Sequence, residues 1–195
     1  MATPTADDWL SALQRVDGAV YATVAGTPTA PLDEGLRRLS RAANYSRLSI
    51  ASAAVLALAG GPGGRRAAAA GLGTVALTSA FVNLLVKPAA RRRRPERDRH
   101  APPDDRIVGM PSSASFPSGH TAAAFAFASA VGRSLPVAAI PLRLLATAVG
   151  YSRVHTGVHY PGDVVAGGLI GEVIAELSAG AVDAAAARLP AAQPS

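Results

Sequence analysis

Residues 67–86, AAAAGLGTVALTSAFVNLLV, run for twenty positions without a charged side chain. An α-helix rises about 1.5 Å per residue, so a helix of this length crosses the roughly 30 Å hydrocarbon layer of a bilayer. Within that layer the backbone must satisfy its own hydrogen bonds, which restricts spanning structures to helices and closed barrels. The segment therefore predicts a membrane-spanning helix, and this constrains the fold of the whole chain.

Further apolar segments accompany this helix, at 47–60, 118–132, 136–151 and 164–182. Some are shorter than a full span, which leaves open whether they cross the bilayer or pack inside the protein. Apolar residues make up 49% of the chain but aromatic residues only 5%, and small side chains suit helices packed closely in a membrane. We predict an all-α, integral membrane helical bundle of about five to six helices. The alternative is a soluble, alanine-rich bundle.

The two ends of the chain differ from this apolar middle. Residues 1–34 are predicted to form an N-terminal interfacial segment, because 8–26 is weakly amphipathic and too polar to span. Whether 8–26 inserts is left open. Residues 35–185 are predicted to form the membrane domain, and 186–195, which end in RLPAAQPS, a disordered tail. The chain has no cysteine, which excludes disulfides, thiolate catalysis and cysteine-bound zinc.

Polar residues that suit chemistry gather in three clusters: KPAARRRRP at 87–95, PSGH at 117–120 and SRVHTGVHYPGD at 152–163. The first follows the second apolar segment, the second opens the third, and the third lies between the fourth and fifth. If each segment crosses the bilayer once, an even number of crossings separates the clusters. We therefore expect all three on the same face of the membrane.

Together the clusters suit a tetrahedral oxyanion. Lys87, Arg94 and Arg153 supply positive charge, and the planar arginine fork matches phosphate oxygens. Ser118 and the backbone N–H groups that follow it lie at a predicted helix N-terminus, which favours anions. Gly119 lets the backbone approach a ligand closely. These five residues are the predicted phosphate-binding set.

Two histidines and a carboxylate extend the pattern to catalysis. Asp163 follows His159 by four residues and can fix the tautomer of that ring, which leaves the other nitrogen free as a nucleophile. His120, from another helix, can protonate the leaving oxygen. The predicted reaction is phosphoryl transfer to His159 followed by hydrolysis of the phosphohistidine. We expect no metal and no cofactor, because the basic groups supply the charge stabilisation.

The ordered pattern K-x6-RP, PSGH and SR-x5-H-x3-D resembles the type 2 phosphatidic acid phosphatase family, which shares its site with vanadium-dependent haloperoxidases. The resemblance covers 87–163 by motif and roughly 35–182 by helix pattern. It implies a multi-pass enzyme of the cell membrane that hydrolyses a lipid phosphate, such as a polyprenyl phosphate, phosphatidic acid or phosphatidylglycerophosphate. The resemblance implies that His120 is the general acid, that His159 is the nucleophile and that Asp163 orients His159. It implies that phosphate is bound by Lys87, Arg94, Ser118, Gly119 and Arg153.

Several residues outside this set have simpler interpretations. Arg91, Arg92 and Arg93 are predicted to form a topogenic or anionic-lipid patch, so that of this run only Arg94 reaches the site. His155 and His159 could form a metal triplet with Asp163 on a continuous helix, but the glycines and proline between 157 and 162 argue against such a helix. His155 has no assigned role. Glu172 and Glu176 share a helix face, which favours a partly wet helix over a functional pair.

Competing functions remain at this stage. The main alternative is a non-catalytic membrane protein that binds anionic lipid through its arginines. A vanadate-dependent oxidase and a membrane metalloenzyme are further alternatives. A nucleic-acid partner is not expected, because no aromatic residues interleave the arginine run. The expected partners are a lipid phosphate and the bilayer, while the oligomeric state and the membrane face of the site stay open.

Overall fold

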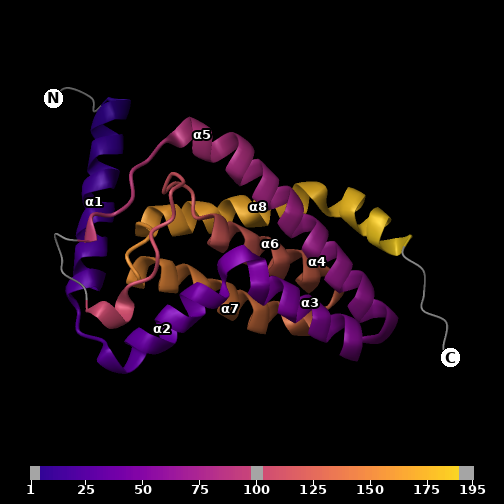
Figure 1. The fold of residues 1–195 in the computed structure, drawn as a ribbon. Coiled ribbons are helices and arrows are strands. Elements are labelled where there is room, and N and C mark those ends of the chain that lie inside the picture. Colours follow the sequence, from indigo (N-terminus) through magenta and orange to yellow (C-terminus); the bar gives the residue numbers. More distant parts are fainter. Residues whose placement is uncertain (1–4, 98–102, 189–195) are drawn as a thin grey trace.

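The computed structural model describes residues 5–97 and 103–188, and within these residues the chain is helical, with no β-strand (Figure 1). Seven helices longer than two turns account for the architecture. They are α1 (Ala6–Gly26), α2 (Ala30–Ala42), α3 (Arg47–Ala59), α4 (Gly61–Phe81), α6 (Gly119–Ser134), α7 (Pro136–His155) and α8 (Pro161–Ala187). The predicted all-α bundle is confirmed, and it has more helices than the five to six expected.

The helix that carries the uncharged stretch is longer than predicted. α4 continues through a π-helical turn, Val82–Val86, into the short α5 (Lys87–Ala90), so the helix runs without interruption over Gly61–Ala90. It is one of three described helices that are long and apolar enough to cross a membrane, together with α7 and α8. α3 and α6 have 13 and 16 residues, so they are shorter than a full span.

A tight turn at Gly60 and Gly61 separates α3 from α4. Gly60 ends α3, and Gly61 has a φ of +56°, a left-handed conformation that glycine adopts without a steric penalty. Pro62, Gly63 and Gly64 belong to the first turn of α4. Proline has no backbone N–H, and this costs nothing here because the first N–H groups of a helix have no acceptor within the helix.

α6 forms the centre of the bundle and packs against α4, α7 and α8. Glycines bring the helices close: a Cβ added to Gly171 of α8 would lie 2.2 Å from the carbonyl oxygen of Ala122, and one added to Gly167 would lie 2.5 Å from that of Ser118. This is the close approach that small residues allow between membrane helices. It fixes the N-terminus of α6 against the first half of α8.

α1 runs across one end of the bundle, and α2 lies at the same end (Figure 1). Tyr21 and Ala25 of α1 pack against Val154 of α7, while Trp9 and Leu13 are more than half exposed. α1 is not among the helices that qualify as membrane spans. The interfacial character and the boundary predicted for residues 1–34 stay predictions, and residues 1–4 lie outside the described residues.

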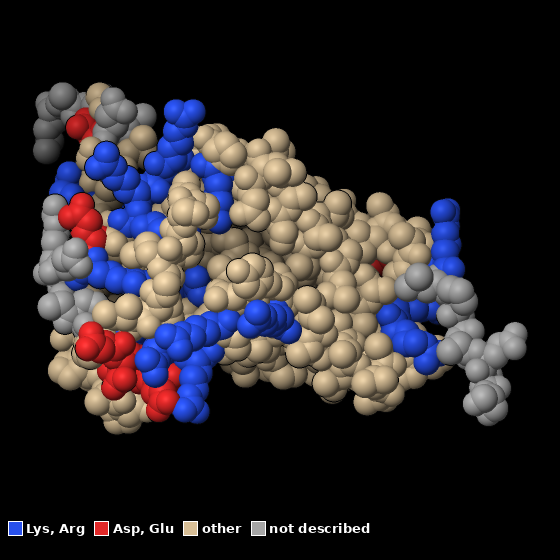
Figure 2. Space-filling view, in the orientation of Figure 1, with Lys and Arg blue, Asp and Glu red and all other residues tan. Residues whose placement is uncertain are grey.

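Charged side chains gather at the end of the molecule where α1 and α2 lie, with a smaller group at the opposite end and a largely uncharged surface between them (Figure 2). On α8, Glu172 lies 3.3 Å from Arg143 and Glu176 lies 3.7 Å from Arg133. Glu172 and Glu176 therefore both have arginine partners, in keeping with a structural role. Of the predicted disordered tail, Ala186 and Ala187 end α8, and 189–195 lie outside the described residues.

Candidate active site

The three polar clusters meet at the charged end of the bundle. Arg94 of the first cluster contacts His159 of the third, with 3.3 Å between Nη1 and Nε2. The backbone N–H of Ser118, in the second cluster, donates to the carbonyl oxygen of Asp163 at 2.9 Å. These contacts bring the three clusters together. That the clusters lie on one face of the membrane stays a prediction.

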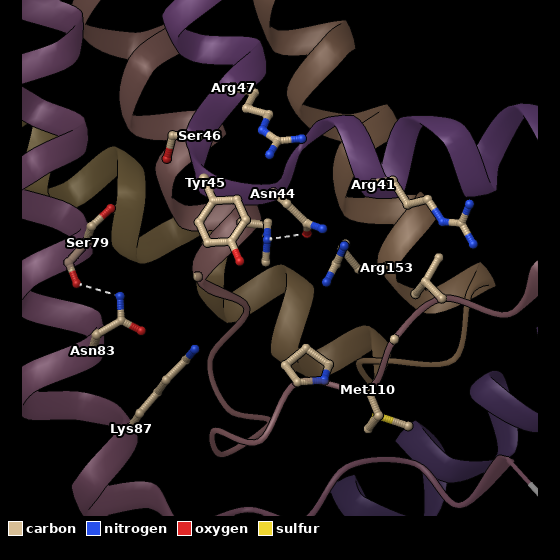
Figure 3. Close-up of a pocket in the computed structure, with 15 residues that line it drawn as sticks. Arg41, Asn44, Tyr45, Ser46, Arg47, Ser79, Asn83, Lys87, Met110 and Arg153 are labelled. Atoms are coloured by element: carbon tan, nitrogen blue, oxygen red, sulfur yellow. Dashed lines mark hydrogen bonds between the residues drawn. The ribbon is translucent and has the colours of Figure 1, made fainter.

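A cavity of about 790 Å³ opens beside this meeting point. Four of the predicted site residues line it: Lys87, Gly119, His120 and Arg153. In Figure 3 Lys87 and Arg153 point into the same space from different helices. The other four, Arg94, Ser118, His159 and Asp163, are not part of the cavity lining. Of these, Ser118, His159 and Asp163 are buried.

The N-terminus of α6 faces the cavity next to Lys87. A Cβ added to Gly119 would lie 3.6 Å from Nζ of Lys87, so the glycine leaves room between the ammonium group and the backbone. The first N–H groups of a helix have no intrahelical acceptor and can bind an anion there. Ser118 differs from the expectation, because its hydroxyl bonds Thr121 at 2.9 Å and its side chain is fully buried.

His159 lies in the turn between α7 and α8, where a continuous helix is broken as predicted. Its Nδ1 lies 3.4 Å from Oδ2 of Asp163. This distance is longer than an ordinary hydrogen bond, and catalytic hydrogen bonds often tighten only when the substrate is bound. Both side chains are buried, with His159 1% exposed. The pair has the orientation that would direct Nε2 away from the carboxylate.

Burial also controls the charge of this histidine. It lowers the pKa of His159 to about 4, and the positive charges of Arg94 and Arg153 act in the same direction, while Asp163 opposes them. Charging an imidazole away from water is costly. At neutral pH His159 therefore carries a lone pair on one ring nitrogen, as a nucleophile requires.

Asp163 is held by more groups than the sequence indicated. Oδ1 accepts from Arg92 at 2.7 Å, and Oδ2 accepts from the hydroxyl of Ser115 and from the backbone N–H of Tyr160. Arg92 also pairs with Asp17 of α1 at 2.6 Å. The prediction that Arg92 belongs to a surface patch was wrong, because its side chain reaches the carboxylate of the site.

Arg153 is 2% exposed, and one terminal nitrogen, Nη1, donates to the backbone oxygen and the hydroxyl of Ser40, each at 2.8 Å. Within residues 5–97 and 103–188, no carboxylate lies within ion-pair distance of it, and its Nε has no hydrogen-bond partner. The backbone oxygen of Arg153 accepts from the N–H of His159 at 3.2 Å. A buried cation without a carboxylate partner is suited to an anionic ligand.

His120 has a partner that the sequence did not reveal. Its Nε2 lies 3.1 Å from Oδ1 of Asn44, in the turn between α2 and α3 (Figure 3). Because an amide oxygen accepts, Nε2 carries the hydrogen in this arrangement. No motif spacing links position 44 to position 120, so this contact required the structure.

His155, which had no assigned role, lies in a separate buried cluster. Its Nε2 is 3.0 Å from Oδ1 of Asp33, and Nε of Arg106 donates to the same oxygen at 2.9 Å. Burial raises the pKa of Asp33, but hydrogen bonds from Thr29 and Arg106 outweigh burial and hold it below its usual value. The cluster joins α2, α7 and the loop before α6.

No three His, Asp or Glu side chains in the described part of the chain come together in a way that could hold a metal ion. That the reaction needs no metal stays a prediction.

The fold and the clustered residues define a helical membrane phosphatase of the type 2 phosphatidic acid phosphatase class. Residues 68–185 match the model of the PAP2 superfamily, and the chain belongs to this superfamily. It is 38% identical over 154 residues to decaprenylphosphoryl-5-phosphoribose phosphatase of Mycolicibacterium smegmatis, which covers 76% of this chain and 77% of that protein. The protein of the same name from Mycobacterium tuberculosis is 37% identical over 106 residues, 52% of this chain and 54% of its own.

Two solved structures share the fold. LpxE of Aquifex aeolicus superposes with a TM-score of 0.64 at 24% identity, over 82% of this chain and 92% of that one. A transmembrane PAP2 type phosphatidylglycerolphosphate phosphatase from Bacillus subtilis gives a TM-score of 0.63 at 23% identity, over 93% and 90%.

Proposed function

We propose that this protein is a membrane lipid phosphatase that works through a phosphohistidine on His159. The observation that carries the proposal is the placement of a neutral, buried His159 between Asp163 and Arg94, next to a cavity lined by Lys87, His120 and Arg153. A nucleophile, an orienting carboxylate, an acid and phosphate-binding cations are the parts that phosphoryl transfer requires.

In the first step, Nε2 of His159 attacks phosphorus and the bond from phosphorus to the leaving oxygen breaks. His120 gives a proton to that oxygen, and Asp163 stabilises the charge that develops on the His159 ring. Burial and the neighbouring cations lower the pKa of His120 to about 3, so this proton is taken up together with the bound phosphate, whose negative charge favours the imidazolium. Lys87, Arg94 and Arg153 bind the phosphate oxygens, together with the free backbone N–H groups at Gly119. Ser118 contributes by placing this helix end, because its own N–H is bonded to Asp163.

In the second step, water attacks the phosphohistidine. His120, now neutral, takes a proton from that water, the bond between phosphorus and Nε2 breaks, and inorganic phosphate leaves. The three cations offset the charge on the phosphate in both steps. The proposal requires neither a metal ion nor a cofactor.

The substrate we propose is a polyprenyl-phosphoryl pentose 5-phosphate, the class of compound named in the two mycobacterial relatives. Such a lipid carries a phosphodiester between the prenyl chain and the sugar and a phosphomonoester at carbon 5. A monoester presents three unesterified oxygens to the three cations, whereas a diester presents two, so the monoester is the group removed. The apolar helices would keep the prenyl chain in the bilayer of the cell membrane, where we place this multi-pass protein.

Phosphate release from a panel of lipid phosphates, in the presence of a chelator, tests this function. We expect turnover of the pentose 5-phosphate lipid by the wild-type protein, insensitivity to EDTA and inhibition by vanadate. His159→Ala should lose turnover and keep its helical content and its melting temperature. Loss of wild-type activity with EDTA, or full activity in His159→Ala, would overturn the mechanism.

The alternative is a non-catalytic protein that binds anionic lipid through its arginines, and the same variant separates the two. A lipid-binding protein would show no phosphate release in the wild type, and His159→Ala would leave its binding to anionic vesicles unchanged.

A further inference from the structure

Two cations that have no role in the proposed chemistry also line the cavity. Arg41 is in the last turn of α2 and Arg47 begins α3. In Figure 3 both lie on the side of the cavity away from Lys87, with Arg153 between. The lining thus holds four cationic side chains and no carboxylate.

Neither arginine is paired with a carboxylate within residues 5–97 and 103–188. Arg47 stacks near the ring of Tyr45, with 5.4 Å from its guanidinium carbon to the ring centroid. By contrast, Arg38 on the same helix as Arg41 is paired with Glu34 and does not line the cavity. Unpaired guanidinium groups that face a cavity are available for a ligand anion.

The turn between α2 and α3 determines the backbone positions of Arg41 and Arg47. The turn between α2 and α3 holds Tyr45 and Ser46 at φ values of +56° and +55°, a conformation that is unfavourable for residues other than glycine. The same turn carries Asn44, which bonds His120, and Ser40 at the end of α2 bonds Arg153. Arg41 and Arg47 are therefore one to three residues from groups that contact the proposed site.

The size of the cavity also exceeds what one phosphate group needs. A cavity of about 790 Å³ lies within the range of about 300–1,000 Å³ that holds a whole drug-sized ligand. A phosphate bound at Lys87 and Arg153 would leave space for a sugar and a second charged group towards Arg41 and Arg47.

We propose that Arg41 and Arg47 form a second anion subsite, which binds the phosphodiester that joins the sugar to the prenyl chain. This inference rests on the proposed function, since it assigns the second phosphate of the proposed substrate. The phosphomonoester then lies at His159, the sugar crosses the cavity, and the diester meets the two arginines. The subsite makes the protein selective for lipids that carry two separated anionic groups over those with a terminal phosphate alone.

The test compares the double variant Arg41→Gln/Arg47→Gln with the wild type on two lipids: a polyprenyl-phosphoryl pentose 5-phosphate and phosphatidic acid. Binding is measured in the His159→Ala background in detergent micelles, so that it does not depend on turnover. We expect the double variant to bind the two-phosphate lipid at least about tenfold more weakly, and phosphatidic acid less than about threefold more weakly. Arg38→Gln is the matched control, and it should bind both lipids like the parent.

Equal weakening for both lipids would show that the arginines attract any anionic lipid, and no weakening would show that they do not bind the substrate; either result overturns the subsite. Turnover is measured separately in the His159-containing proteins. If the wild type hydrolyses neither lipid but the binding difference is present, the proposed function fails and the subsite stands.

Discussion

Arg106 and Arg153 are both almost completely buried, yet their surroundings are opposite. Each nitrogen of the Arg106 guanidinium has an acceptor: Nε donates to Asp33, and the terminal nitrogens donate to three backbone oxygens and the hydroxyl of Thr29. Arg153 bonds Ser40, has an Nε without a partner, and faces the cavity. No carboxylate in the described part of the chain pairs with it.

The difference separates a structural cation from a binding cation. Arg106 fastens the loop that contributes Val108, Gly109 and Met110 to the cavity wall, and its charge is already neutralised. Arg153 has a positive charge beside the cavity and no carboxylate partner. This charge lowers the stability of the fold, but it attracts a phosphate group to the cavity. Substitutions at the two positions should therefore affect different properties.

The largest expected effect is on activity, in Arg153→Ala. Removing a group that stabilises the transition state typically lowers kcat by about 10²–10³-fold. Because a buried charge without a carboxylate partner is removed, we expect the melting temperature to stay the same or to rise. Steady-state phosphate release and thermal unfolding of the same preparation measure both. A variant that unfolds like Arg106→Ala would contradict the distinction.

Arg106→Ala should show the reverse pattern. Breaking a buried ion pair leaves Asp33 without its charge partner, which costs about 3–5 kcal/mol. We expect a markedly lower melting temperature, and a kcat for the folded fraction that stays within about tenfold of wild type. Adding Asp33→Asn should recover part of the lost stability, because it removes the unpaired charge. Normal stability of the single variant would show that the pair is dispensable.

The cations beside His159 also predict how this histidine titrates. Arg94 and Arg153 add to burial in lowering its pKa to about 4. Between about pH 6.5, the usual value for histidine, and pH 4, the unfolded chain binds a proton here and the folded chain does not, so stability falls as the pH falls through this range. Ring-nitrogen shifts of ¹⁵N-histidine-labelled protein should show His159 neutral at pH 5. Asp163→Asn should lower the pKa further, and titration near 6.5 would contradict the burial of the ring.

The smallest effect is expected at Arg92, which acts through another residue. It donates to Asp163, and the aromatic ring of Tyr160 lies 4.4 Å from its guanidinium carbon. As a positioning residue, Arg92→Gln should lower kcat about tenfold with little change in KM. The control is Arg93→Gln, since Arg93 is exposed. A shift in the His159 titration that accompanies the lost activity would support positioning of the His159–Asp163 pair, and an unchanged titration would contradict it.

The helical bundle could be predicted from the sequence, because apolar segment length is a local property of the chain. The meeting of the three clusters could be predicted because their residue types together suit one anion. The contacts of Asn44 with His120 and of Arg106 with Asp33 could not, since their partners lie far apart in sequence and no periodicity links them. Arg92 was misjudged for a related reason. Nothing within a run of four arginines indicates which side chain turns inward. The packing of α1 against α8 places Asp17 where Arg92 can pair with it.

The phosphoenzyme itself tests the mechanism most directly. The protein is mixed with a lipid carrying a ³²P-labelled terminal phosphate, quenched in alkali within a turnover, digested and mapped. We expect transient labelling of His159 as phosphohistidine in the wild type, and no labelled peptide in His159→Ala. Turnover without any labelled histidine, or with label on a different residue, would contradict the role of His159 as nucleophile.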